Sequence, residues 1–278
     1  MADKPFPHEL LIEASRGESR YWKDLLLYRE LFLFLAWRDF LVRYKQTAIG
    51  IAWAVIQPLL LMVILTIVFH VVAGMKSDSV PYPVLVLSGL WPWLFFAGAL
   101  GESSGSLIAN SPLVSKVYFP RLIVPASSVL VSLADFLVTG TLLAALMAWY
   151  GVYPGWTIVM LPVLLALTMG AAFGAGLWFS ALNVEYRDFR YVVPFVIQLG
   201  LYASPVGFGT DKVPEAFRFL AYLNPMTGII GGFRWSLLGG RAPFDGTGLA
   251  VSAALTAALL ASGLWYFRRM EKTFADVI

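Results

Sequence analysis

Six long apolar stretches with very few charged residues constrain this chain more than any other feature. A bilayer core about 30 Å thick needs roughly 20 apolar residues to be crossed as a helix, and all six stretches are long enough. They cover residues 48–73, 84–108, 122–150, 156–182, 191–208 and 247–267. They lack the alternation of barrel strands, and an open sheet edge cannot lie in hydrocarbon. The chain is therefore predicted to be an all-α integral membrane protein with six transmembrane helices.

The composition agrees with lipid as the main solvent. Hydrophobic residues make up 59% of the chain and charged residues 13%, with a mean hydropathy of +0.75, whereas about a quarter of an ordinary soluble domain is charged. The chain has no cysteine, which excludes disulfides and cysteine-based metal or nucleophile sites. Mixed charges precede the first apolar run near Ala48, so we expect no cleavable signal peptide and a first span that stays as an anchor.

The distribution of positive charge predicts the orientation. Fifteen of the 20 Lys and Arg residues lie in the N-terminal segment, the second-to-third gap, the fourth-to-fifth gap and the tail. Positive residues concentrate on the cytoplasmic side of a membrane. Both termini of this inner-membrane protein are therefore predicted to be cytoplasmic, and the net charge of +3 reflects topology, not a nucleic-acid partner.

The polar leader (1–24) and tail (269–278) flank an interfacial helix (25–46) and a transmembrane domain (47–268). Within the predicted interfacial helix, the apolar core Leu31 to Trp37 is far too short to cross a bilayer. It is expected to lie in the cytoplasmic interface. Its charges do not sort onto one helical face, so a simple anchor and packing of its aromatic residues on neighbouring spans both stay open.

Residues 213–240, between the fifth and sixth spans, form a second unusual segment. Two short apolar pieces, Phe217 to Leu223 and Thr227 to Leu238, are separated by Asn224-Pro225, and each is well below spanning length. Two half-helices dipping into the outer leaflet explain this pattern, provided that protein or a wet cavity covers the broken backbone. A plain extracytoplasmic loop is the alternative.

The residues that support catalysis are scarce. The chain has only two histidines, His8 and His70, and neither an HExxH nor a GxxxxGK[ST] motif. Energy from ATP would therefore have to come from another subunit. Asp135 lies near the middle of the third span, where an ionised group costs about 2.5 to 3.5 kcal/mol. We expect it to face the bundle and to bond Ser, Thr or backbone; a proton relay is the alternative.

The short connector after the second span is expected to be an exposed helix of about two turns. Ser111 suits the cap, Pro112 suits the first helical position, and Pro120 biases Phe119 away from helix. Its apolar side chains would either seat in a partner's groove or lie on the membrane surface; these are Leu113, Val114, Val117 and Tyr118.

Five stretches together resemble the type-2 ABC exporter permeases, which move lipid-linked polysaccharides such as O antigen, capsule and teichoic acid. They span nearly all of the membrane region in order, and the RYKQT and NPMT segments look most like O-antigen permeases. The stretches are RYKQTAIGIAWAVIQPL (43–59), LVSKVYFPRLIVPAS (113–127), ALNVEYRDFRYVVPFVIQL (181–199), ASPVGF (203–208) and NPMTGIIGGFRWSLLG (224–239).

The resemblance implies a homodimer bound to two copies of a separate ATPase subunit, which would hold ATP and Mg²⁺; no cofactor is implied on this chain itself. It also implies that residues 25–45 lie beside a lateral gate. The implied ATPase-coupling residues are Asn110, Ser111, Pro112, Leu113, Val114, Ser115, Lys116, Val117, Tyr118, Glu185, Arg187 and Asp188.

The same resemblance assigns residues 213–240 to an extracytoplasmic gate and expects aromatic rings to stack on the sugars of a passing glycan. The implied gate residues are Phe217, Phe219, Tyr222, Asn224, Pro225, Phe233 and Trp235, and the candidate channel aromatics are Trp53, Trp91, Trp93, Tyr202 and Phe233. No catalytic residues and no metal ligands are implied.

The sequence leaves three functional hypotheses open. The leading hypothesis is ATP-driven export of undecaprenyl-linked polysaccharide, with O antigen ahead of capsule or teichoic acid. A permease for a drug or a small lipid is the second, although an aromatic content of 15% favours glycans. The third is a membrane transferase acting on lipid-linked sugars, which would need paired carboxylates or a histidine near a membrane face; Glu102 and Asp135 are too far apart to be convincing.

Overall fold

A computed structural model describes residues 18–45, 50–77 and 80–274. Most of the predicted leader, the predicted start of the first span at Ala48 and the last four residues of the tail lie outside these ranges. The described residues contain helices and no strands, which confirms the all-α class. In chain order the helices are α1 (Glu18–Leu27), α2 (Arg29–Lys45), α3 (Gly50–Thr66), η1 (Ile67–Val72), α4 (Tyr82–Ala109), α5 (Ser111–Lys116), α6 (Ile123–Trp149), η2 (Trp156–Met160), α7 (Leu161–Glu185), α8 (Phe189–Ala203), η3 (Thr210–Lys212), α9 (Glu215–Tyr222), α10 (Pro225–Leu237) and α11 (Gly246–Met270).

Five helical segments in the described ranges are long and apolar enough to cross a membrane: Ala52–Val72, Tyr82–Ala109, Ile123–Trp149, Trp156–Glu185 and Gly246–Met270. They match five of the six predicted spans to within a few residues. The remaining prediction, the fifth span at residues 191–208, corresponds to α8, which has 15 residues and ends at Ala203. That length is short of the roughly 20 residues needed to cross, so a sixth span stays a prediction.

Helix α4 is the central element of the bundle. It packs against α6 and α7, and α7 packs in turn against α11. The α7–α11 crossing is close, because a Cβ atom added to Gly174 would lie 2.7 Å from backbone atoms of Leu259 and Leu260. Small residues allow this approach. The small residues at 170–176 thus serve helix packing.

Local signals set several helix ends. Asn224 caps α10 by accepting from the backbone N–H of Met226, and Asp245 caps α11 by accepting from the N–H of Gly248. Helix α8 ends before Pro205, because proline disfavours helical backbone in the preceding residue, and Ser204 is extended (φ −94°, ψ 148°). These breaks leave short pieces of helix at one end of the bundle.

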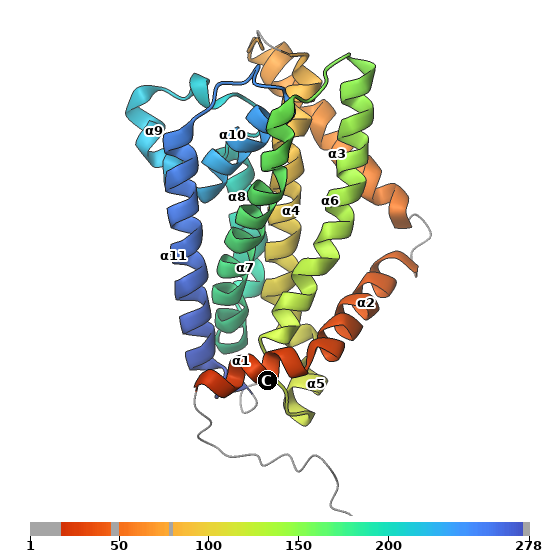
Figure 1. Cartoon of the computed structure of the whole chain (residues 1–278), viewed down its shortest axis with the longest axis vertical. Helices are drawn as coiled ribbons and strands as arrows, with labels where there is room; N and C mark the ends of the chain where they lie inside the picture. Colours follow the sequence, from red (N-terminus) through yellow and green to blue (C-terminus); the bar gives the residue numbers. More distant parts are fainter. Residues whose placement is uncertain (1–17, 46–49, 78–79, 275–278) are drawn as a thin grey trace, which may run out of the picture.

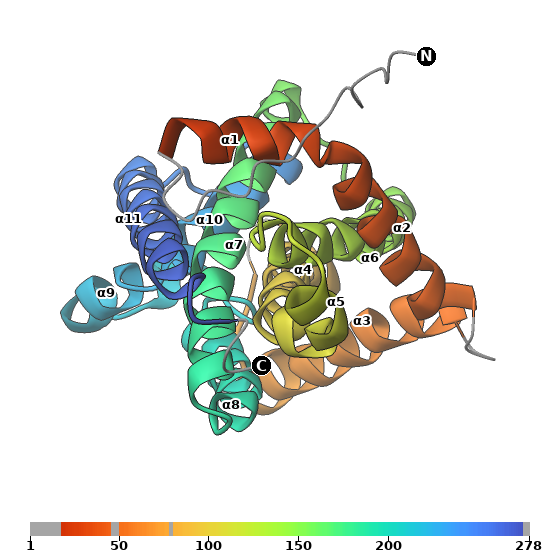
Figure 2. The same ribbon diagram turned by 90° about the horizontal axis from the view of Figure 1, so that it is seen from below.

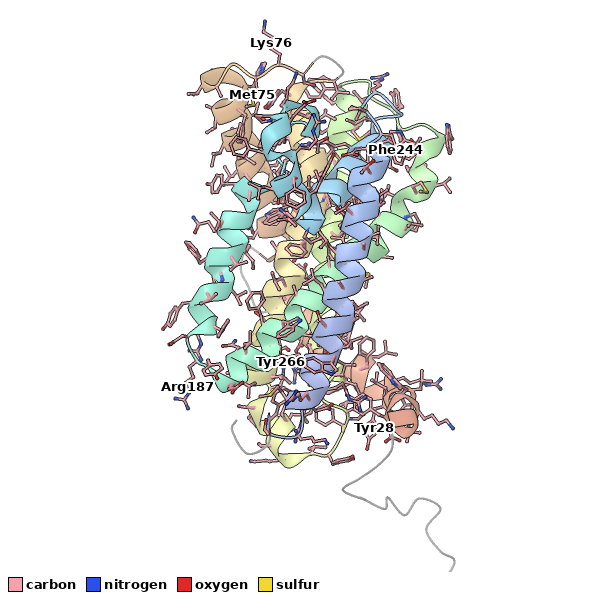
Figure 3. The ribbon with its side chains drawn as sticks, turned by 90° about the vertical axis from the view of Figure 1, so that its left-hand side faces the viewer. Tyr28, Met75, Lys76, Arg187, Phe244 and Tyr266 are labelled. Atoms are coloured by element: carbon pink, nitrogen blue, oxygen red, sulfur yellow. The ribbon has the colours of Figure 1, made fainter. Side chains whose placement is uncertain are left out.

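The two ends of the bundle differ (Figure 1). We call the end with α1, α2 and α5 the α5 end, and the opposite end, with α9 and α10, the α9 end. The last turn of α11 lies beside α1 at the α5 end, and α1 and α2 run around its edge (Figure 2). Tyr28, Arg187 and Tyr266 mark the α5 end, whereas Met75, Lys76 and Phe244 mark the α9 end (Figure 3).

Candidate functional site

The short helix α5 joins α4 to α6, as the connector pattern indicates. Asn110, directly before it, donates from Nδ2 to the carbonyl of Ser106 at 2.9 Å and accepts at Oδ1 from Arg38 of α2 at 2.6 Å. Because this amide is engaged elsewhere, no side chain caps the helix. Ser111 is the first helical residue, so its predicted capping role is wrong. Pro112 stands in the first turn, where a missing N–H is tolerated.

The two sides of α5 have different surroundings. Val114 is 1% exposed and packs in a cluster with Leu107 and Ile123, so its side chain faces the bundle in this structure. Leu113 is half-buried against the same cluster. Val117 and Tyr118, directly after α5, are 50% and 55% exposed, and Ser115 and Lys116 in its last turn are also exposed. A partner can therefore reach Pro112 and residues 115–118 of this connector.

The turn between α7 and α8 lies at the same end. Its predicted coupling residues Glu185, Arg187 and Asp188 are exposed. Arg187 and Asp188 line a cavity of about 420 Å³ together with Ser111. The structure thus brings two segments that are about 75 residues apart in sequence to the border of one cavity. A partner that contacts α5 at this end can contact the α7–α8 turn as well.

Polar contacts attach α2 to the bundle. Arg43 forms an ion pair with Asp135 of α6 at 2.7 Å, and Tyr44 donates a hydrogen bond to the same carboxylate. Arg43 also lies 3.4 Å from Glu102 of α4. The interhelical role predicted for Asp135 is confirmed, but its partners are these side chains and not Ser, Thr or backbone.

The opposite side of α2 is apolar and exposed. Leu33, Phe34 and Trp37 are each about 60% exposed, whereas Leu35 is buried. Arg43 near the end of α2 pairs with Asp135 of the bundle, whereas Lys45 is exposed, so the helix does not show a uniformly polar outer face. This mixed arrangement explains why the charges do not sort in the expected way along the sequence.

A buried carboxyl ties α1, α6 and α11 together at the α5 end. Glu271, directly after α11, accepts at Oε1 from the backbone N–H of Arg121 at 2.8 Å and from the hydroxyl of Tyr21 at 3.2 Å. The guanidinium of Arg268 lies 3.6 Å from the centre of the Tyr21 ring. Burial raises the pKa of Glu271 and of Tyr21. The fold therefore favours the neutral form of both groups.

The α9 end contains the two short helices predicted within residues 213–240. They are α9 and α10, separated by Leu223 and Asn224, with Pro225 first in α10. Phe217 and Phe219 of α9 are 59% and 72% exposed, and Tyr222 donates to Asp245 at 2.6 Å. The two helices and the break between them are confirmed. Their position relative to a lipid leaflet remains a prediction.

Arg234 of α10 is a buried cation that the sequence reasoning did not single out. It is 3% exposed and donates to three backbone carbonyls, those of Leu85, Val206 and Phe208, the last at 2.6 Å. A Cβ at Gly89 would lie 2.6 Å from its Nη2, so that glycine makes room for the guanidinium.

The carbonyls of Val206 and Phe208 belong to the irregular chain that follows α8. Tyr82 of α4 also donates to this chain, at the carbonyl of Gly207 and a distance of 2.6 Å. Buried non-helical backbone needs such donors. Arg234 and Tyr82 therefore hold the broken end of α8 against α4.

The candidate channel aromatics occupy two kinds of environment. Trp91 stacks on Phe136 at 4.3 Å between ring centres and lies edge-on to Phe233. Trp91, Trp93 and Phe233 are 8%, 3% and 0% exposed, so in this structure they are core residues with no face free for a sugar. Trp53 and Tyr202, at 55% and 62% exposure, keep accessible faces. Trp235 is half-buried, with its ring between those of Trp156 and Phe244.

Comparison with known proteins identifies the chain's family. Residues 30–238 match the family described as ABC-2 type transporter, and this range is about three quarters of the chain. The chain belongs to the ABC-2 type transporter family. The match includes α2 to α10, and thus both ends of the bundle described above.

Individual relatives cover nearly the whole ABC-2 chain. It is 28% identical to the O-antigen export system permease protein RfbA of Klebsiella pneumoniae over 250 residues, which are 90% of this chain and 95% of that protein. It is 27% identical to the protein of the same name from Myxococcus xanthus over 261 residues, 93% and 99% of the two chains. The polysialic acid transport protein KpsM of Escherichia coli is 24% identical over 240 residues, 84% and 91% of the two.

Proposed function

We propose that this ABC-2 chain is the membrane-spanning permease of an ATP-driven exporter that moves undecaprenyl-linked polysaccharide, O antigen first among the candidates, across the inner membrane. The observation that carries the proposal is the family match over residues 30–238, with relatives named as O-antigen export permeases along nearly their full length. The sequence contains no GxxxxGK[ST] motif. ATP and Mg²⁺ are therefore assigned to two copies of a separate ATPase subunit.

In this proposal the α5 end faces the cytoplasm, together with both chain termini. The ATPase subunit contacts the exposed residues 115–118 and the α7–α8 turn, whose Arg187 and Asp188 line the same cavity as Ser111. The charge distribution of the sequence supports this orientation. Helix α2 lies in the cytoplasmic interface with its apolar side toward lipid, because Arg43 near its C-terminal end pairs with Asp135 of the bundle while Leu33, Phe34 and Trp37 are exposed.

Helices α9 and α10 form the re-entrant pair on the outer side, and α8 with the irregular chain after it is the sixth crossing. Non-helical backbone is tolerated at membrane depth only where protein or water satisfies it. The bonds from Arg234 and Tyr82 to the carbonyls of residues 206–208 meet that requirement. In this arrangement α9 and α10 gate the exit of the glycan.

A second copy of the chain completes the pathway. Helices α3 and α8 have broadly exposed apolar surfaces, including Trp53 and Leu60 on α3 and Leu199 and Tyr202 on α8. Pairing of two protomers along these helices would place the exposed aromatic rings toward a shared route. Such rings can stack on many sugars in succession without a fixed set of hydrogen bonds.

Other cargoes are the nearest alternatives. The similarity to KpsM favours a capsule polysaccharide as the second candidate, followed by teichoic acid. A drug or a small lipid as cargo is supported only by membership of the broader family. A membrane transferase for lipid-linked sugars is a different class, and the match to a transporter family argues against it.

Loss of the gene in its host tests this proposal. We expect surface polysaccharide to disappear and the undecaprenyl-linked glycan to accumulate on the cytoplasmic side, with both effects reversed by the intact chain. A host that keeps normal surface polysaccharide and accumulates no lipid-linked glycan would contradict the proposed cargo.

A further inference from the structure

A hollow lies beside the central helix α4, near the α5 end. On the α8 side it is a cavity of about 370 Å³ lined by Gly101 and Gly105 of α4 and by Val193, Ile197 and Arg190 of α8. The same two glycines line a second cavity, of about 570 Å³, on the α2 side. A Cβ atom at Gly105 would meet nothing within 4 Å. The glycines therefore leave open space along α4 that a ligand can fill.

A buried amide borders this space, and one of its atoms has no partner. Asn183 of α7 is 4% exposed and lines the α8-side cavity. Its Nδ2 donates to the carbonyl of Ser104 at 3.1 Å, which fixes the orientation of the amide. Within the described residues its Oδ1 has no hydrogen-bond partner. A buried acceptor without a donor is costly, so a shift of this side chain that brings Oδ1 to a ligand's hydroxyl group would be favourable.

The charge in the α8-side cavity comes from Arg190. In the described ranges its guanidinium has no ion pair or hydrogen bond, and it lines the cavity beside the amide of Gln198. On the α2 side, the cations Arg38 and Arg43 are paired with acids. A guanidinium binds phosphate oxygens through two parallel hydrogen bonds, so the α8 side is the part of the hollow that favours an anion.

We propose that this hollow binds the phosphosugar end of a lipid-linked glycan. Arg190 binds the phosphate, and Asn183 Oδ1 accepts from a sugar hydroxyl. Val193 and Ile197 pack against the apolar part of the ligand beyond the phosphate. The inference rests on the proposed function and adds to it a place where the headgroup is recognised before export.

Equilibrium binding to the full-length chain in lipid nanodiscs tests this site. The probe is radiolabelled undecaprenyl diphosphate-linked N-acetylglucosamine. We expect Arg190→Gln to weaken binding roughly tenfold to a hundredfold, the range for lost hydrogen bonds to a charged group. Arg29→Gln, which removes an exposed cation outside the hollow, should leave the affinity within about twofold. Equal affinity of Arg190→Gln and the unaltered chain would overturn the site.

Gly105→Leu is a second test variant, and its expected effect on binding does not come from a loss of stability. Leucine is favoured over glycine within a helix by about 1 kcal/mol, and open space surrounds this position. We expect the variant to melt no lower than the unaltered chain and to lose at least about tenfold in probe affinity, since the side chain occupies the ligand's volume. Unchanged binding to this well-folded variant would also overturn the inference.

Competition binding experiments distinguish which phosphate-containing compound the site recognises. Unlabelled undecaprenyl diphosphate without sugar should compete less well than the sugar-linked form, and phosphatidylglycerol and inorganic pyrophosphate less well again. Equal competition by phosphatidylglycerol would overturn a headgroup-specific site. If the unaltered chain transports the glycan but Arg190→Gln binds it normally, only the site fails. If the unaltered chain neither binds nor transports it, the proposed function fails.

Discussion

Arg234 shows how one side chain stabilises an interrupted helix. Its guanidinium replaces the donors that a continuing α8 would have supplied to the carbonyls of residues 206 and 208. Gly89 provides the space, because any side chain there would collide with the guanidinium. The arginine therefore belongs to a packing arrangement that involves α4, α8 and α10 together.

Removing this guanidinium should destabilise the chain. We expect Arg234→Leu to lower the free energy of unfolding by about 3 kcal/mol or more, because three largely buried carbonyls each lose a donor at about 1–3 kcal/mol apiece. Arg234→Lys should recover only part of this, since one ammonium cannot reach all three carbonyls. Thermal unfolding in detergent measures the effect, with the exposed Arg241→Leu as control. Equal melting of the Arg234→Leu and Arg241→Leu variants would contradict the role.

The ion pair between Arg43 and Asp135 attaches α2 to α6. Both side chains are about one-third exposed, so we expect a coupling energy of only about 1 kcal/mol, in the range for partly screened pairs. A double-mutant cycle with Arg43→Ala and Asp135→Ala, followed by thermal unfolding, measures it. Strictly additive effects of the two substitutions would show that the pair contributes nothing to holding α2.

Among the elements, the long spans were predictable and the side-chain partners were not. Continuous apolar runs bounded by polar residues locate α4, α6, α7 and α11 to within a few residues, because bilayer thickness fixes their length. The early end of α8 has a signal in Ser204-Pro205, which the apolar run through residue 208 obscured.

The candidate site depended more on tertiary packing. The pairing of Asp135 with Arg43 crosses 92 positions in sequence, and periodicity gives no information on such pairs. The inward direction of Val114 depends on where α5 meets the ends of α4 and α6. For the same reason the unused oxygen of Asn183 could not be inferred from its surroundings in the sequence.

Helix α5 gives a sharper coupling experiment than the sequence alone allowed. Val117→Asp with Tyr118→Asp alters only exposed side chains, so we expect the permease to fold normally but to lose ATP-dependent export. Val114→Asp places a carboxylate in a buried cluster and should lower the melting temperature instead. Co-purification of the ATPase subunit, export and thermal unfolding are measured together. Normal export by the Val117→Asp, Tyr118→Asp variant would remove the connector of α5 and residues 117–118 from the coupling role.

At the scale of the whole molecule, the helices around the buried centre differ in how much of their apolar surface is covered. Helix α4 is the most buried of the five long spans, whereas α3 and α8 have apolar surfaces that no described part of the chain covers. Lipid or a second copy can cover such surfaces. A shared route for a long glycan requires the second copy, so this distinction bears directly on transport.

Cysteine cross-linking tests the second copy without background, because the chain has no cysteine of its own. We expect single substitutions Leu60→Cys on α3 or Leu199→Cys on α8 to give disulfide-linked dimers in native membranes. Ala257→Cys, on an exposed part of α11, should stay monomeric. Absence of dimers from both test positions, with the control unchanged, would argue that lipid covers these helices.

Reconstitution tests the central claim most directly. The chain and its ATPase subunit are placed in proteoliposomes with a fluorescent undecaprenyl-linked glycan, and a membrane-impermeant lectin reports glycan on the face opposite to the ATPase. The account predicts that the lectin signal appears with ATP and Mg²⁺, and that it is absent with a non-hydrolysable ATP analogue or without this chain. Glycan that crosses at the same rate without ATP, or that stays on the ATPase side throughout ATP hydrolysis, would contradict it.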